Sequence, residues 1–158
     1  MKHPGMVNKI DIATMKNFEW SEVNFEKVKK IISKYPSDKQ QSAVIPVLDL
    51  AQRQNDGWLS KNAIEKVAET LSMPYIRVLE IATFYSMFNL EPIGKNFVQI
   101  CRTTPCWLRG CEKLLKTAKN FTGCELGITT EDKLFTIVEV ECLGACSNAP
   151  MVQINDDY

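Results

Sequence analysis

The chain has 158 residues, of which 45% are hydrophobic, and its 19 basic and 19 acidic residues give a formal charge of zero. This length and apolar content are sufficient for one ordinary domain, or for a small domain with a helical extension, and exclude a chain that is mainly disordered. Without net charge there is no long-range field to attract nucleic acid or an anionic membrane. We therefore expect partners to be recognised by shape.

The N-terminal segment lacks the continuous apolar stretch of a secretory signal. No run approaches the roughly 20 apolar residues that a membrane-spanning helix needs, so we expect no direct membrane insertion. Six cysteines without an export signal indicate a reducing compartment, where clustered cysteines bind metals more often than they form disulfides. We expect no disulfide.

Residues 1–20 have no clear periodicity and are predicted to form a loose N-terminal arm. Apolar residues at helical spacing then predict helices over residues 22–35 and 39–54, a third helix beginning after Ser60, and a fourth over residues 74–88. Ser21 and Ser60 are suitable N-caps, and Pro46 must lie near the start of its helix or kink it. The fourth helix is apolar on nearly every side, so we expect it to be covered on every side, by the bundle, by the following module or by a partner.

Turn residues at positions 91–94 mark a boundary, after which the pattern changes. Strands are predicted over residues 97–101, 135–141 and 151–154, and a helix over residues 107–119 with Leu108, Cys111, Leu115 and Ala118 on its inner face. The sequence therefore predicts an α+β protein: the arm at 1–20, a helical bundle at 21–92, and a small α/β module at 93–158.

Four cysteines form two pairs, and each pair lies where a predicted strand ends. Cys101 and Cys106 are separated by four residues, and Cys142 and Cys146 by three. Turns at strand ends leave backbone amides free to face a charged ligand, and we expect the amides near Thr103, Thr104 and Gly144 to hydrogen-bond to sulfur. Gly144 also permits a positive φ. Cysteine thiolates in two pairs are typical of a [2Fe-2S] cluster with one pair on each iron.

Spacing alone leaves three interpretations open, of which the iron–sulfur cluster is favoured. A structural zinc site also takes four cysteines with similar spacing, and the thiols could instead be unliganded. Cys111 is predicted to be a small core residue, and Cys124, in a predicted loop, is a poor ligand candidate.

Other sites receive little support from the sequence. The single histidine, His3, lies in the arm, and no glycine-rich nucleotide loop is present. Arg102 and Arg109 flank the first pair, where they would either balance an anionic cluster or be ordinary solvated charges.

Three segments together resemble a known family. They are Ala82–Phe88 (ATFYSMF), Thr104–Trp107 (TPCW) and Glu141–Pro150 (ECLGACSNAP). The chain from about Lys30 to Tyr158 resembles the 24 kDa, or NuoE-type, subunits of respiratory complex I, the NADH:quinone oxidoreductase. The resemblance implies a thioredoxin-like ferredoxin fold after a helical bundle, with one [2Fe-2S] cluster on Cys101, Cys106, Cys142 and Cys146.

In that family the cluster exchanges single electrons with the FMN of a neighbouring subunit that also binds NADH. The resemblance therefore implies, as partners, this FMN/NADH-binding subunit and other peripheral-arm subunits, with no nucleic acid. It places the chain on the cytoplasmic side of a bacterial inner membrane, or on the matrix side in mitochondria. Family members usually continue past Tyr158 through a strand and a helix, so we expect a C-terminally truncated sheet or one that is completed differently.

Two alternatives stand beside this interpretation. The first is the equivalent [2Fe-2S] subunit of an NAD-linked hydrogenase or formate dehydrogenase. The second, from another class, is a structural four-cysteine zinc module that serves assembly only.

Overall fold

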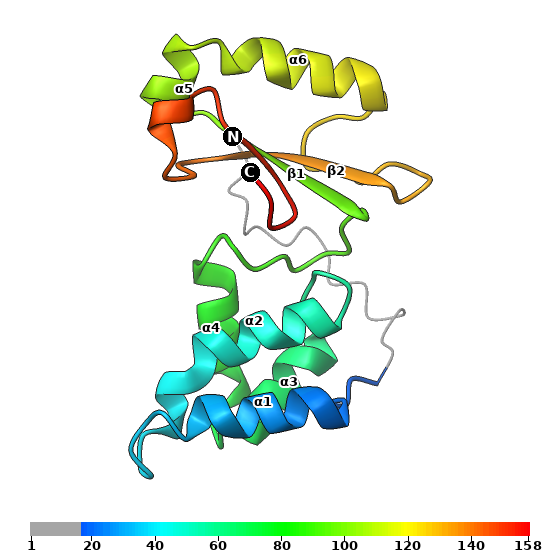
Figure 1. Cartoon of the computed structure of the whole chain (residues 1–158). Helices are drawn as coiled ribbons and strands as arrows, with labels where there is room; N and C mark the ends of the chain where they lie inside the picture. Colours follow the sequence, from blue (N-terminus) through cyan, green and yellow to red (C-terminus); the bar gives the residue numbers. More distant parts are fainter. Residues whose placement is uncertain (1–16) are drawn as a thin grey trace. The chain divides into compact units, whose positions relative to one another are not determined.

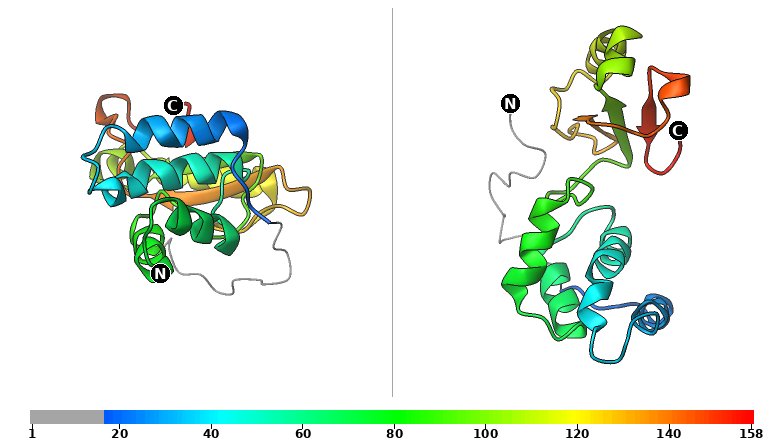
Figure 2. Two further views of the ribbon diagram at one scale, coloured as in Figure 1. Left: turned by 90° about the horizontal axis from the view of Figure 1, so that it is seen from below. Right: turned by 90° about the vertical axis from the view of Figure 1, so that its left-hand side faces the viewer.

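The chain forms two compact units that divide between Pro92 and Ile93. The computed structural model describes residues 17–158, so His3 and most of the predicted arm lie outside the described residues. The first unit is helical and the second combines a sheet with helices (Figures 1 and 2). The predicted α+β class is confirmed. No helix within residues 17–158 is long and apolar enough to cross a membrane.

The first unit contains four α-helices and one 3-10 helix in its described part. They are α1 (Glu22–Ile32), η2 (Gln40–Ala43), α2 (Val44–Gln54), α3 (Lys61–Thr70) and α4 (Tyr75–Phe84). Both predicted N-caps are confirmed, because the Ser21 and Ser60 hydroxyls accept hydrogen bonds from the Asn24 and Ala63 amides at 3.3 and 3.2 Å.

The helix predicted over residues 39–54 is divided into η2 and α2. Pro46 is the third residue of α2, in the first turn, where a backbone N–H has no partner within the helix. Pro46 therefore lies near the start of its helix, which is one of the two predicted alternatives.

The core of this unit is built from the apolar stripes of its helices. Its best-buried side chains larger than alanine are each at most 2% exposed: Val28, Val47, Leu48, Leu59, Ile64, Val67, Leu71, Val78 and Phe88. Burial of this apolar surface is what holds the four helices together, since helices of 10 or 11 residues are marginal alone.

Helix α4 differs from its prediction. It ends at Phe84 because Tyr85 adopts an extended backbone (φ −88°, ψ 114°), and the chain then turns Phe88 into the core. Within α4 only Val78 and Ala82 are buried, whereas Ile76 is 55% and Phe84 75% exposed. Within the helical unit the helix is therefore not covered on every side.

Residues 17–20, predicted to be part of the loose arm, pack on the helical core. Phe18 is 8% exposed and meets Trp20 edge to face, with ring centroids 5.2 Å apart. The Trp20 indole N–H donates to the Thr70 hydroxyl at 3.0 Å, and the Gln54 side-chain amide donates to the Glu19 carbonyl at 2.7 Å. These contacts hold the segment without any regular secondary structure.

The second unit contains a three-stranded sheet in the order β2–β1–β3. Its strands are β1 (Asn96–Cys101), β2 (Phe135–Val140) and β3 (Val152–Ile154). Strand β2 is parallel to β1, and β3 is antiparallel to it. The three predicted strands are confirmed to within about two residues at each end. Helix α6 (Cys111–Thr122) packs across one face of β1 and β2 (Figure 1).

The helix predicted over residues 107–119 is two helices, α5 (Thr104–Leu108) and α6. Gly110 interrupts them with a left-handed backbone, φ +89°. Because of this break, Leu108 points away from the core and is 71% exposed, so its predicted inner position was wrong. Cys111 and Leu115 are buried as predicted.

Replacing Phe18 by alanine tests whether residues 17–20 are part of the helical core. Phe18→Ala should lower the free energy of unfolding by about 3 kcal/mol, because a buried ring is lost and a cavity remains. The measurement is urea unfolding followed by far-UV circular dichroism. Phe25→Ala is the matched control, since this ring in α1 is 42% exposed and should cost less than about 1 kcal/mol. Equal losses for the two variants would contradict the packing.

Candidate metal centre

Both cysteine pairs lie at one edge of the sheet. Cys101 is the last residue of β1, and Cys142 follows β2 after one intervening residue. The parallel register pairs Cys101 with Val140, so the carboxyl ends of β1 and β2 are level. Cys106 lies in α5, which is separated from the end of β1 by two residues, and Cys146 begins the 3-10 helix η3 (Cys146–Asn148). The strand-end positions predicted for the two pairs are confirmed.

Cys101 lies at the junction of the two turns. Its thiol donates to the Glu141 carbonyl at 2.9 Å, and its sulfur is 3.2 Å from the Thr103 hydroxyl. Burial raises the pKa of Cys101, but hydrogen bonds from Thr103, Cys106 and the Leu143 amide outweigh burial, so the pKa is lowered overall. The site therefore stabilises a thiolate at this position, which is the form that binds metals.

The pKa values of Cys106 and Cys146 are raised, in part by the charges of neighbouring cysteines. Burial is the main reason that the pKa of Cys106 is raised, and the negative charges of Cys101 and Cys146 raise it further. Burial also raises the pKa of Cys146, followed by the charge of Cys142. The negative charges of neighbouring thiolates thus oppose ionisation of Cys106 and Cys146. A cationic ligand that binds all of them would remove this repulsion.

The Cys142 turn supplies an amide to its own sulfur. The Gly144 N–H donates to the Cys142 sulfur at 3.3 Å, and Gly144 has φ +74°, as the sequence predicts. The amides predicted at Thr103 and Gly144 are both used, whereas in the described part of the chain the Thr104 amide has no such contact. The turn is also held from outside by Tyr158, whose hydroxyl donates to the Leu143 carbonyl.

The two pairs differ in exposure. Cys101 and Cys106 are each 1% exposed, whereas Cys142 and Cys146 lie at the surface. Among residues 17–158 no group of three or more His, Cys, Asp or Glu side chains is placed to hold a metal ion. A [2Fe-2S] cluster takes four thiolates, two on each iron, so each cysteine pair would hold one iron. This cysteine-only donor set, with amide donors around it, fits such a cluster.

The remaining two cysteines are separate from these pairs. Cys111 is fully buried among the apolar residues under α6, and burial raises its pKa, so its predicted role as a core residue is confirmed. Cys124 is half-buried in the loop after α6. All six cysteines are free thiols.

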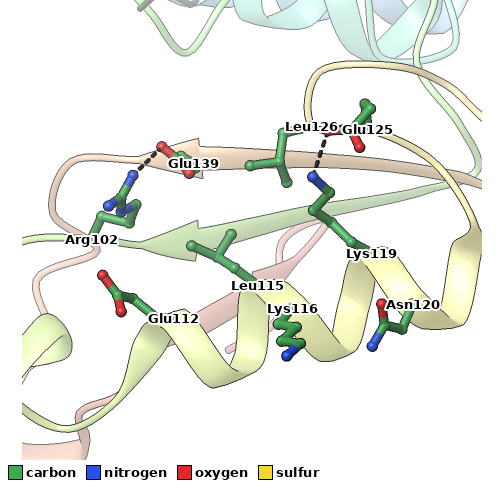
Figure 3. A pocket seen from close by; sticks show the side chains of 9 residues that line it. All are labelled: Arg102, Glu112, Leu115, Lys116, Lys119, Asn120, Glu125, Leu126 and Glu139. Carbon is green, nitrogen blue, oxygen red and sulfur yellow. Dashed lines mark hydrogen bonds and ion pairs between the residues drawn. The ribbon is translucent and has the colours of Figure 1, made fainter.

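Arg102, one of the two predicted cluster-balancing charges, turns away to an open groove beside α6. Figure 3 shows it directed at Glu139, and the two groups form an ion pair at 2.8 Å. This hydrogen-bonded pair raises the pKa of Arg102. Lys119 and Glu125 form a second pair along the same groove (Figure 3). Arg102 is thus already neutralised by a carboxylate. Arg109 is exposed at the end of α5.

Two side chains of the site were not predicted from the sequence. The Thr103 hydroxyl contacts the Cys101 sulfur, although only the amide was predicted to contribute, and Tyr158 anchors the second turn. A threonine directly before Thr-Pro-Cys is an N-cap signal, which would place its hydroxyl near the turn. The Tyr158 contact joins residues 15 apart and leaves no local signal.

The comparison with protein families decides the assignment. The family model described as thioredoxin-like [2Fe-2S] ferredoxin matches residues 28–158. The chain belongs to this family. The resemblance read from the three sequence segments is thereby confirmed.

Relatives of this ferredoxin include subunits of respiratory enzymes. The chain is 56% identical over 142 residues to an NADH-quinone oxidoreductase subunit of Rickettsia bellii, covering 90% of this chain and 85% of that protein. It is 55% identical over 141 residues to the mitochondrial NADH dehydrogenase [ubiquinone] flavoprotein 2 of Dictyostelium discoideum, covering 89% of this chain and 57% of that protein.

A solved structure shares the fold of this ferredoxin. It is an NAD+-reducing [NiFe]-hydrogenase in the H2-reduced state, with a TM-score of 0.60 and 22% identity. The match covers 70% of this chain and 19% of the hydrogenase chain. At this identity the likeness concerns the fold alone.

Alkylation of the metal-free ferredoxin tests the unequal burial of its pairs. A maleimide should label Cys142 and Cys146 at least tenfold faster than Cys106 and Cys111, because reaction requires access to the sulfur. Peptide mapping by mass spectrometry after short exposures gives the order, and labelling in urea gives the unprotected reference. Uniform labelling of all six thiols without denaturant would contradict the buried first pair.

Proposed function

We propose that this chain is the electron-transfer subunit of an NADH:quinone oxidoreductase and that it carries one [2Fe-2S] cluster on Cys101, Cys106, Cys142 and Cys146. The observation that carries the proposal is the meeting of two cysteine turns at one sheet edge, in a chain 56% identical to a subunit of an NADH-quinone oxidoreductase. The enzyme activity belongs to the assembled complex, of which this chain is one component.

The contribution of the chain itself is to hold and shield the ligands. When bound, the cluster supplies one-electron chemistry, which protein side chains cannot perform. The first pair lies in an apolar environment against which Leu143 and Ala145 pack, and the second faces solvent. The Thr103 and Gly144 contacts to sulfur stabilise negative charge at the ligands. Proton transfer plays no part in this function.

The partner that donates electrons is a neighbouring subunit that binds FMN and NADH. Other peripheral-arm subunits complete its surroundings, on the cytoplasmic side of a bacterial inner membrane or the matrix side in mitochondria. Trp107 and Leu108 support a docking role for the surface around α5, because they directly follow Cys106 and are 54% and 71% exposed. Exposed aromatic and aliphatic side chains beside an electron carrier are suited to a protein partner.

The two units have separate tasks in this proposal. The helical bundle of residues 21–92 presents its own exposed apolar side chains, among them Ile76 and Phe84, to other proteins of the complex. The ferredoxin domain of residues 93–158 contains all four proposed ligands.

Serine substitutions test the ligand assignment. Cys→Ser at position 101, 106, 142 or 146 should abolish the cluster or change its visible and EPR spectra, because a hydroxyl is a poor substitute for a thiolate. Cys124→Ser is the matched control, and Cys111→Ala serves for the buried thiol. Both controls should keep the wild-type spectra in protein purified without oxygen. Loss of the cluster in a control alone would refute the assignment.

The second candidate is the equivalent subunit of an NAD-linked hydrogenase, which the shared fold favours. Affinity purification of the chain from its native cells distinguishes the two. Recovery of quinone-reducing activity dependent on NADH supports the respiratory enzyme, and recovery of hydrogen-dependent NAD+ reduction without it supports the alternative.

A further inference from the structure

Thr103 occupies an N-cap position but does not cap its helix. It precedes α5 with the extended backbone typical of an N-cap (φ −68°, ψ 164°). A threonine in this position normally accepts a hydrogen bond from an amide of the first turn. The Thr103 side chain makes no such bond, and its hydroxyl lies 3.2 Å from the Cys101 sulfur. The local stabilisation of a cap is replaced by a contact with a proposed ligand.

The direction of this hydrogen bond follows from counting protons. The Cys101 thiol has one proton, and it is donated to the Glu141 carbonyl at 2.9 Å. The hydrogen bond with Thr103 therefore requires the hydroxyl to donate to sulfur. A cysteine that ligates iron has no proton at all, so in that state too the hydroxyl is the only possible donor of the pair.

We propose that Thr103 is a positioning residue that raises the reduction potential of the cluster by donating a hydrogen bond to the Cys101 sulfur. The proposal rests on the proposed function, because it requires Cys101 to be a ligand. Addition of an electron increases the negative charge shared by the cluster and its sulfur ligands. A hydrogen-bond donor then stabilises the reduced state more than the oxidised state, which raises the potential.

Because Cys101 is buried, the Thr103 hydroxyl should affect the reduction potential more than the other polar groups near the site. Cys101 is 1% exposed, so water cannot take the place of the Thr103 donor. Cys142, in contrast, is at the surface, where water competes with the Gly144 amide. The nearby Arg102 charge is compensated by Glu139 at 2.8 Å. Thr103 is therefore the side chain whose removal should change the potential most.

Potentiometric titration of the full chain, purified without oxygen and followed by EPR, tests the proposal. Thr103→Val has nearly the same shape without the hydroxyl. We expect it to favour the oxidised cluster by about threefold to tenfold, which is a decrease of roughly 30–60 mV for one electron. Thr103→Ser keeps the hydroxyl and should remain close to wild type. Thr104→Val, at the exposed neighbouring position, is the matched control and should also stay close to wild type.

Three results would overturn the proposal. One is a midpoint reduction potential of Thr103→Val that equals that of the wild type at equal iron content. Another is a decrease in the potential of Thr104→Val as large as that of Thr103→Val. If Thr103→Val does not load iron, Thr103→Ser is compared with Thr103→Ala, because these two variants differ only in the hydroxyl. Equal midpoint potentials for these two variants are the third result. Failure of the proposed function is distinguishable, because then the wild-type chain itself would contain no iron–sulfur cluster.

Discussion

The parallel pairing of β1 and β2 is the constraint on which the site depends. Parallel strands place their carboxyl ends at the same edge, and the register of Cys101 opposite Val140 brings both turns to one level. A shift of one residue would move Cys101 to the other face of the sheet. Gly94 permits the close approach of the chain before β1 to the start of β2, because a Cβ there would lie 2.6 Å from the backbone of Phe135. A small sheet thus determines which sulfurs can meet.

The proposed function assigns different tasks to the two cysteine pairs, which differ in burial. The inner pair, Cys101 and Cys106, is shielded from water, and in the proposed function it holds one iron in a fixed geometry. The outer pair, Cys142 and Cys146, lies at the surface, where the proposed function places electron exchange with a partner subunit. Such a division suits an electron carrier, since the potential is set by the enclosed side while exchange takes place at the open side.

Local features of this site and fold were predictable from the sequence. Caps at Ser21 and Ser60, the strand before Cys101 and the strand-end positions of both pairs depend on residues close together in the chain. The metal itself was not decided by spacing, which also permits zinc. It was the residues around the cysteines that indicated the ferredoxin family.

Features that depend on distant contacts were not predictable. The segment of Phe18 and Trp20 is held by a hydrogen bond from Trp20 to Thr70, and the second turn is held by one from Tyr158 to Leu143. Leu108 is exposed because the left-handed backbone of Gly110 ends one helix and begins another. The apolar spacing in the sequence continues across Gly110 and so does not indicate this break. Thr103 is the clearest example of a contact that could not be predicted. A threonine at this position indicates an N-cap, but its hydroxyl contacts the Cys101 sulfur instead.

The most direct measurement is metal and sulfide analysis of the full chain purified without oxygen, combined with EPR before and after dithionite. We expect about two iron atoms and two sulfides per chain and an EPR signal that appears only on reduction. A colourless protein with stoichiometric zinc, no iron and no signal would contradict this expectation.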